Sequence, residues 1–348
     1  MKAAVFHGPK DLRLEDVPVP AISSRELLLK VRACAICGSD VRTYRSGASN
    51  ITEPVTIGHE VTGTIVEAGK QLTGFLPGQR VAVAPAVPCG DCPYCAANTE
   101  TMCDNLRSIG YQFHGGFAEY MAVPYAAVKA GCVNTIPDNL SFEEATLAEP
   151  LACAINGQEL LDVRAGDSVL ILGAGPMGCL HACLAKVRGA WKVILVDVVE
   201  QRLELARAFG TDVLLNGNST DLRERVWEET GGAGASVVIV AAPSGKAQEQ
   251  AVTLAAKRGR ISFFGGLPKD NPLVSLNANL VHYRELFIMG AYGSSPSHNR
   301  MALELLASGK IPTSQFLGLT VPLERIEEGL KAIAEGRVLK VVVKPDGD

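Results

Sequence analysis

The sequence has no strong excess of charge of either sign and no long uninterrupted apolar run. Its formal net charge is -4 over 348 residues, which provides no basic surface for nucleic acid or for an anionic membrane. The first residues turn polar within six positions, which predicts no secretory leader, and the apolar stretch that starts at Ser168 is broken by three glycines and a proline. We therefore expect a cytoplasmic protein with no nucleic-acid and no membrane partner.

The composition indicates an ordinary globular chain of about two domains, since 47% of its 348 residues are hydrophobic. It has ten cysteines, and in a long chain without a secretory leader clustered cysteines favour metal ligands over disulfides. Five of them lie among apolar or small residues and are interpreted as small buried hydrophobes: Cys34, Cys132, Cys153, Cys179 and Cys183.

Four other cysteines fall within fifteen residues in the run VPCGDCPYCAANTETMC. Cys89, Cys92, Cys95 and Cys103 have the spacing C-x2-C-x2-C-x7-C. This spacing allows four thiolates to converge on one ion, as a closed tetrahedral zinc site requires. Because all four positions of such a site are occupied by sulfur, we expect this zinc to be structural.

The chain has two regions with different patterns of apolar residues. From Met1 to about Leu151, short Val-, Ile- and Leu-rich segments alternate with Gly and Pro turns, which is typical of a compact all-β unit. From Asp167 to about Gly293, six continuous apolar runs are separated mostly by helix-like segments, which predicts a parallel sheet covered on both faces. Two helices and an apolar strand follow Ser297. We expect this tail to rejoin the first domain, because six strands complete a doubly wound sheet, and we place the domains at 1–151 with 294–348 and at 152–293.

The first apolar run of the second domain leads into a glycine-rich turn, Gly173-Ala-Gly175-Pro176-Met177-Gly178. Between a strand and a helix, this G-x-G-x-x-G motif predicts binding of a dinucleotide pyrophosphate at the helix N-terminus. Asp197 ends the next apolar run about twenty residues later, where a carboxylate binds the adenosine ribose. This favours NAD over NADP, although Arg202 could contact a ribose or a phosphate. Asp197 could also cap a helix, and both roles are compatible.

A second group of metal-binding residue types lies before the cysteine cluster. Cys37 occurs in ACAICGSD, and His59 and Glu60 occur in VTIGHEVTG. One thiolate, one imidazole and one carboxylate are ligands that a catalytic zinc uses when it keeps a position open for substrate. Taken singly, a histidine in a turn or a lone cysteine is more often structural.

The motifs CGSD, GHE, the four-cysteine loop, GGFAEY, EPL and GAGPMG occur in one order along the whole chain. In this the sequence resembles zinc-dependent medium-chain dehydrogenases, and most closely the branch of sorbitol (polyol) and threonine dehydrogenases. The resemblance implies a GroES-like, β-rich catalytic domain and a Rossmann domain with a doubly wound six-stranded parallel sheet. It implies two zinc ions per chain and NAD, and a homotetramer or homodimer.

The resemblance also implies the catalytic set. Cys37, His59 and Glu60 would bind the catalytic zinc, and Glu149 of the EPL motif would approach it directly or through a water molecule. Ser39 would pass on the substrate proton. Many relatives have a histidine three residues after this hydroxyl, but here the position is Arg42, which stays protonated and is a poor base. Proton release through the ribose, Glu149 or water remains open.

Further contacts follow from the strand ends. Ligands of doubly wound sheets lie beyond the carboxyl ends of the strands, and the candidates there are Ala242, Gly265, Gly266 and Tyr292. Either glycine could equally serve a simple turn. Tyr44 and His114 are candidates for the substrate cleft, or they are ordinary packing residues.

The leading functional prediction is an NAD-dependent zinc dehydrogenase that oxidises a secondary alcohol of a polyol, sugar or sugar derivative to a ketone. Such a zinc polarises the hydroxyl while NAD accepts a hydride. Oxidation of an amino alcohol, as in threonine dehydrogenase, is an alternative, and so is a phosphorylated polyol. A redox or metal-sensing module that binds NAD without turnover is the alternative from another class.

Overall fold

The computed structural model describes residues 1–218 and 221–346, which form two compact units. The first unit comprises Met1–Ala152, Gly293–Gly309 and Thr313–Asp348. The second comprises Cys153–Tyr292 and Lys310–Pro312. The chain therefore leaves the first unit near residue 152 and returns to it near residue 293.

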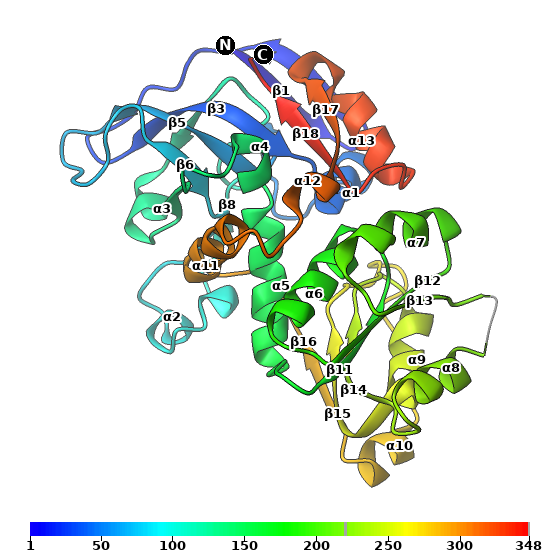
Figure 1. Cartoon of the computed structure of the whole chain (residues 1–348). Helices are drawn as coiled ribbons and strands as arrows, with labels where there is room; N and C mark the ends of the chain where they lie inside the picture. The colour runs from blue at the N-terminus through cyan, green and yellow to red at the C-terminus, as the bar shows by residue number, and fades with distance from the viewer. Residues whose placement is uncertain (219–220, 347–348) are drawn as a thin grey trace. The chain divides into compact units, whose positions relative to one another are not determined.

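The second unit is built on a parallel sheet, coloured green to gold in Figure 1. Within the described residues its strand order is β13-β12-β11-β14-β15-β16, and every neighbouring pair is parallel. The strands are β11 (Ser168–Leu172), β12 (Lys192–Asp197), β13 (Val213–Asn216), β14 (Ala235–Val240), β15 (Ala255–Phe263) and β16 (Phe287–Gly290). β11 is buried throughout because helices cover both faces of a doubly wound sheet. The predicted six-stranded Rossmann sheet is confirmed.

The first unit is built mainly on antiparallel strands. Its main sheet has the order β10-β6-β5-β3-β18-β17, with β9 also paired to β3. These strands are β3 (Leu27–Ala35), β5 (Glu60–Ala68), β6 (Arg80–Val83), β9 (Tyr120–Val123), β10 (Val133–Thr135), β17 (Leu317–Pro322) and β18 (Lys340–Lys344). Smaller sheets contain β1 (Lys2–Gly8), β2 (Asp11–Asp16) and β4 (Val55–Thr56), and β7 (Ala86–Val87) with β8 (Arg107–Ser108).

The C-terminal tail contributes a strand to this sheet. β18 pairs antiparallel with β3 through Val342 opposite Ala35, so the end of the chain lies beside one of its first strands. Figure 1 draws β18 in red and β3 in blue. The helix α13 (Ile326–Ala334) packs on β17 and β18 and buries Ile326 and Leu330, which are four residues apart and therefore share one helix face.

The expectation of an all-β first unit is wrong in part, because the structure adds helices between its strands. These are α1 (Gly38–Ser46), α2 (Pro93–Ala96), α3 (Tyr125–Lys129), α4 (Phe142–Ala145) and the first turns of α5 (Ala148–Leu160). In the tail, α11 (Pro296–Ala307) and α13 correspond to the two helices predicted there, and the short α12 (Thr313–Phe316) is additional. The reason is visible in α1, where Asp40, Val41 and Thr43 are the buried residues and no apolar stripe marks the helix in the sequence.

The helices of the second unit are α6 (Pro176–Val187), α7 (Glu200–Ala206), α8 (Leu222–Glu229), α9 (Gly245–Leu254) and α10 (Ala278–Tyr283). α6 packs on β11 and β12, and α9 packs on β14 and β15. Short 3-10 turns complete the description at Glu100–Met102, Arg207–Phe209 and Leu323–Arg325. In the described part of the chain, none of the helices has the length and apolarity needed to cross a bilayer.

Candidate active site and metal centres

Two adjacent strands of the first unit bring Cys37, His59 and Glu60 together. β3 ends at Ala35, two residues before Cys37, and β5 begins at Glu60. Ala35 lies opposite Glu60 in the antiparallel register, so the residues that follow one strand face those that precede the other. Gly58 turns the chain before His59 with φ +97, and a side chain there would collide with the Phe117 ring.

The three predicted ligand atoms of this group lie within 4.8 Å of one another. The donor set of thiolate, imidazole and carboxylate is the one that a catalytic zinc uses when it leaves a position for substrate. His59 and Glu60 are buried, at 6% and 0% exposure, and Cys37 is half-buried. Buried groups of this kind need a charge partner or a metal, so the residues fit a zinc ion.

The Asp40 carboxylate contacts two of these residues. One of its carboxylate oxygens accepts a hydrogen bond from the backbone N–H of Cys37 at 2.9 Å, and the other lies 3.2 Å from Nδ1 of His59. This leaves Nε2 of His59 for a metal. Burial opposes a charge on His59, but Asp40 and Cys37 outweigh it and raise the pKa well above its usual value. A carboxylate on the second ring nitrogen is the usual support of a zinc-binding histidine.

Glu60 also has a buried partner. Its carboxylate binds the ammonium group of Lys340, which comes from β18. Burial raises the pKa of Glu60 to about 7 against the pull of Lys340, and the negative charge of Glu149 acts in the same direction as burial. Burial lowers the pKa of Lys340, but the charges of Glu60 and Cys37 outweigh it and raise that pKa. Lys340 could not be predicted from the sequence, because nothing in the tail indicates which of its residues is buried.

Two hydroxyl groups lie at the imidazole side of this centre. Oγ of Ser39 is 3.4 Å from Nε2 of His59. The Tyr111 ring lies 5.8 Å from the His59 ring, between centroids. Burial raises the pKa of Tyr111, so its hydroxyl stays protonated. Tyr111 was missed from the sequence, where it stands in an unremarkable turn before the GGFAEY motif.

Glu149 lies in the first turn of α5, close enough for its charge to act on both Glu60 and Lys340. It is not a member of the group of ligand atoms within 4.8 Å. Its contact with zinc, directly or through water, therefore stays a prediction. Among the apolar-context cysteines, burial is confirmed for Cys34, Cys132, Cys179 and Cys183, whereas Cys153 is half-buried.

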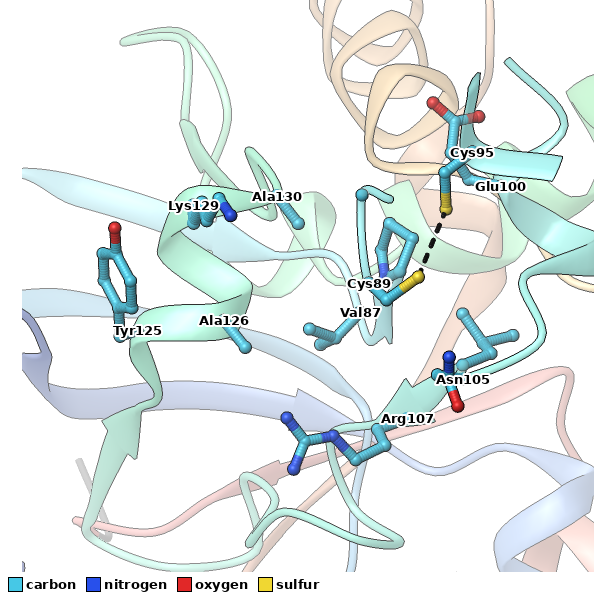
Figure 2. Close-up of a pocket in the computed structure, with 13 residues that line it drawn as sticks. Val87, Cys89, Cys95, Glu100, Asn105, Arg107, Tyr125, Ala126, Lys129 and Ala130 are labelled. Carbon is cyan, nitrogen blue, oxygen red and sulfur yellow. Dashed lines mark hydrogen bonds between the residues drawn. The ribbon is translucent and has the colours of Figure 1, made fainter. Parts of the chain in front are cut away.

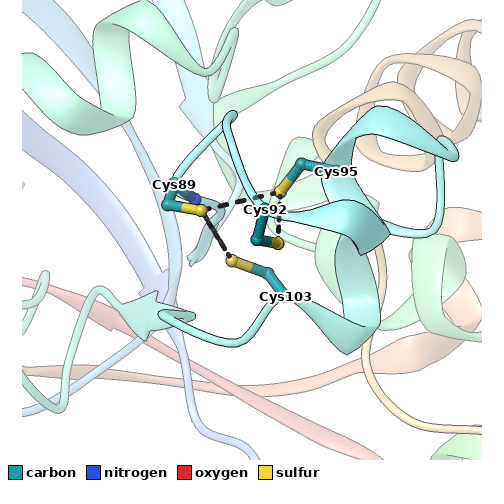
Figure 3. A group of neighbouring side chains, drawn as sticks. All are labelled: Cys89, Cys92, Cys95 and Cys103. Atoms are coloured by element: carbon teal, nitrogen blue, oxygen red, sulfur yellow. Dashed lines mark hydrogen bonds between the residues drawn. The ribbon is translucent and has the colours of Figure 1, made fainter.

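The four-cysteine loop closes around one point, as Figure 3 shows by the convergence of its sulfur atoms. The Sγ atoms of Cys89 and Cys103 are 3.5 Å apart, as are those of Cys92 and Cys95. A tetrahedral zinc with Zn–S bonds of about 2.3 Å separates its sulfurs by about 3.8 Å. Backbone N–H groups of Cys95 and Asp104 lower the pKa of Cys92 to about 6. The residues fit a structural zinc.

A cavity of about 790 Å³ lies beside this loop (Figure 2). Cys89 and Cys95 form part of its wall, and α3 contributes Tyr125 and Lys129. The residues of the Cys37 centre are not among those that line it. The cavity therefore belongs to the structural loop rather than to the centre that could perform chemistry.

The glycine-rich turn of the second unit has the geometry of a pyrophosphate cradle. Gly173 has φ +114, and a Cβ on Gly178 would collide with the carbonyl oxygen of Gly173, so strand and helix approach closely. A Cβ on Gly175 would meet nothing within 4 Å, which leaves space for a ligand at the start of α6. Pro176 and Met177 form the first turn of that helix, whose N-terminus favours an anion.

Asp197 ends β12 and is 6% exposed. Its two oxygens accept hydrogen bonds from the backbone N–H groups of Ala174, at 2.7 Å, and Val199, at 2.9 Å. The alternative that Asp197 is a helix N-cap is wrong, because Val199 is the N-cap of α7 and no side chain caps that helix. A contact of Asp197 with a ribose stays a prediction. The Arg202 guanidinium lies 3.8 Å from the same carboxylate, and its side chain is 41% exposed. The charge of Arg202 is therefore partly neutralised by Asp197.

The other predicted cofactor residues differ in what surrounds them. A Cβ on Gly265 would clash with the backbone of Ala242, which explains that glycine by packing, whereas Gly266 has open space. Ala242 donates its N–H to Leu172 at 3.0 Å, and Tyr292 is 67% exposed. Contact of these residues with a cofactor stays a prediction.

Neither residue predicted for the substrate cleft joins the ligand group. Tyr44 packs against the hydrophobic core of the first unit. His114 accepts a hydrogen bond through Nδ1 from the backbone N–H of Thr56 at 3.2 Å and lines a second cavity. Tyr111 is instead the aromatic residue beside His59. A role of Tyr44 or His114 toward substrate stays a prediction.

A β-rich unit with a zinc-type ligand set and a Rossmann unit with a pyrophosphate cradle define a metal-containing oxidoreductase of the alcohol dehydrogenase type. Comparison with known proteins gives the family. The alcohol dehydrogenase GroES-like domain matches residues 23–134, and the zinc-binding dehydrogenase domain matches residues 176–308. The chain belongs to the zinc-dependent medium-chain dehydrogenases, as its motifs indicated.

Individual relatives are similar over nearly their whole length. A sorbitol dehydrogenase from Bombyx mori is 34% identical over 98% of this chain and 97% of its own. An L-threonine 3-dehydrogenase from Symbiobacterium thermophilum is 33% identical over 96% and 94%. A zinc-binding dehydrogenase from Sinorhizobium meliloti 1021, solved with NADP bound, has a TM-score of 0.92 at 32% identity and covers 99% of both chains. These relatives confirm the predicted branch.

Proposed function

We propose that this protein is a zinc-dependent dehydrogenase that transfers a hydride from a secondary alcohol of a polyol, sugar or sugar derivative to NAD, giving a ketone. The observation that carries the proposal is the meeting of Cys37, His59 and Glu60 beside the Ser39 hydroxyl. The 34% identity to a sorbitol dehydrogenase supports the substrate class. We assign the zinc chemistry to residues 1–151 and 294–348, and the cofactor to residues 152–293.

In this proposal Cys37, His59 and Glu60 hold the catalytic zinc, with Glu149 direct or through water. Zinc at such a site acts as a Lewis acid that lowers the pKa of a hydroxyl. Ser39 passes the substrate proton on: its oxygen takes that proton while its own hydroxyl proton leaves toward the cofactor ribose, Glu149 or water. Arg42 is exposed and remains protonated, so it takes no proton.

The carboxylates near the metal favour a substrate with several hydroxyl groups, because Glu149 can accept hydrogen bonds from hydroxyls next to the reacting carbon. The choice of NAD rests on Asp197. A 2′-phosphate would be repelled by this buried carboxylate, and Arg202 at 3.8 Å is already partly neutralised by it. The relative solved with NADP makes this choice a specific point to test. Assembly as a homodimer or homotetramer completes the proposal.

A second candidate is oxidation of an amino alcohol, which is favoured by the 33% identity to an L-threonine 3-dehydrogenase. A substrate panel separates the candidates. Reduction of NAD by the zinc-loaded protein is followed with sorbitol, xylitol, threonine and a polyol phosphate. We expect turnover with a free polyol, and turnover with threonine alone would select the second candidate. Tight NADH binding without turnover on the whole panel would favour a sensor.

A further inference from the structure

The Lys340 side chain lies inside the metal centre of the first unit. It is 3% exposed, and the Glu60 side chain that it binds is completely buried. Nζ of Lys340 contacts both oxygens of that carboxylate. A buried ion pair is often no more stabilising than a hydrophobic pair of the same volume. Stability alone therefore gives no reason for a charge at this position.

The C-terminal strand places Lys340 at the centre through its register. Val342 of β18 lies opposite Ala35 of β3, and the N–H of Ile36 donates to the carbonyl of Val341 at 2.8 Å. Lys340 is two residues before Val342, as Cys37 is two residues after Ala35, and the charge of Cys37 acts on Lys340. A residue from the end of the chain is thereby fixed beside a metal ligand near its start.

This position has two consequences for a zinc ion. A fixed positive charge close to a divalent cation opposes its binding. In addition, a carboxylate with both oxygens on an ammonium group has less negative charge to give to the metal, and it can rotate toward the metal only by breaking those bonds. Glu60 would then be a weak ligand that a substrate oxygen can displace.

We propose that Lys340 is a positioning residue that restrains Glu60, so that the zinc binds less tightly but keeps a position for substrate. The proposal rests on the proposed function only in taking the metal to be zinc that acts on an alcohol. It predicts an unusual pair of effects. Removal of the Lys340 charge should tighten zinc binding and lower turnover, whereas a merely structural role would weaken both.

The test measures zinc affinity of the Lys340→Met variant by competition with a chromophoric chelator, starting from metal-free protein. We expect the dissociation constant for zinc at the catalytic site to fall by about tenfold. Replacement of residues that contact metal ligands typically changes metal affinity by this order of magnitude. We expect kcat for the panel's best alcohol to fall by a similar factor or more. The matched control is Lys344→Met on the same strand, which removes a half-exposed pair with Glu143 at 3.5 Å and should change neither quantity.

Two further variants make the result specific to Glu60. In the Glu60→Gln/Lys340→Met double variant no charge is left unpaired, so folding is preserved and the tightening should disappear. Lys340→Arg keeps the charge and should restore affinity and kcat toward the original values. Cobalt substitution of the single Lys340→Met variant should change the visible spectrum of the site, because Glu60 moves onto the metal.

Weaker or unchanged zinc binding in Lys340→Met would overturn the proposal, and so would tightening that persists in the double variant. The affinity and the cobalt spectrum need no substrate. The proposal can therefore fail while the polyol assay succeeds, and it can stand even if no alcohol of the panel is oxidised.

Discussion

Asp40 offers the clearest single-residue test of how the catalytic metal is held. It is 2% exposed, and its carboxylate contacts the N–H of Cys37 at 2.9 Å and Nδ1 of His59 at 3.2 Å. In Asp40→Asn the amide oxygen can still accept from Cys37, but the NH₂ group then faces Nδ1. This turns Nδ1 into an acceptor and places the ring proton on Nε2, the nitrogen that must bind the metal.

The size of the effect follows from the two contacts. One charged hydrogen bond becomes a neutral one, which costs about 1 kcal/mol of folding stability. The wrong tautomer should weaken metal binding by about 10- to 100-fold, as loss of such a supporting carboxylate does elsewhere. Asp40→Asn should therefore weaken zinc binding strongly, whereas the melting temperature of the metal-free protein should change little.

The assay is zinc release to a chelator, which distinguishes two sites per chain. Asp40→Asn should release the catalytic zinc more readily and leave the four-cysteine zinc unchanged. Asp16→Asn, a change at the end of β2 outside the ligand group, serves as the matched control. Unchanged affinity of both sites in Asp40→Asn would refute the reasoning that Asp40 sets the tautomer of His59.

Three further predictions concern other parts of the chain. Cys95→Ser should lower the zinc content to about one ion per chain and lower the melting temperature or disturb assembly first; loss of turnover alone would show that the loop has another role. Tyr111→Phe should lower kcat/KM about tenfold without changing zinc content, because it removes a polar group from the ring that lies beside His59, and an unchanged kcat/KM would contradict this. Burial lowers the pKa of His181 to about 3, so the unfolded chain binds its proton first, and stability should fall by about 1.4 kcal/mol per pH unit below about pH 6.5. His181→Leu should flatten that fall in a series of melting curves, and an identical acid slope would count against the interpretation.

The Rossmann unit could be predicted from the sequence because its signals are local. Continuous apolar runs predict buried parallel strands, and the turn from Gly173 to Gly178 has one geometry wherever it joins a strand to a helix. The four-cysteine loop is local in the same way, since its four cysteines lie within fifteen residues. Both predictions depended on neighbours in the sequence and not on distant contacts.

The surroundings of the candidate metal centre could be predicted only in part. Cys37, His59 and Glu60 were identified because they stand in recognisable motifs. Lys340 reaches the same centre through strand pairing across 280 residues of sequence separation, and Tyr111 reaches it through a turn packed near Gly58. Long-range register and loop packing are set by the whole fold, so a single sequence without relatives aligned to it gives no local signal for them.

The helix α1 illustrates the same limit for secondary structure. Its buried positions are the polar residues Asp40 and Thr43 together with Val41, so it has no apolar stripe. Its start is stabilised by a capping box, in which Asp40 accepts a hydrogen bond from the backbone N–H of Cys37. A helix stabilised by a functional site is missed by hydrophobic periodicity.

The most direct test of the account is the rate of nicotinamide reduction by the zinc-loaded protein with free polyols, measured with NAD and with NADP in parallel. The account predicts that a polyol with NAD gives the highest kcat/KM and that Cys37→Ala abolishes it while the structural zinc remains bound. Preference for NADP would contradict the role of Asp197. No turnover on any polyol by a protein that carries both zinc ions and binds NADH would contradict the central claim.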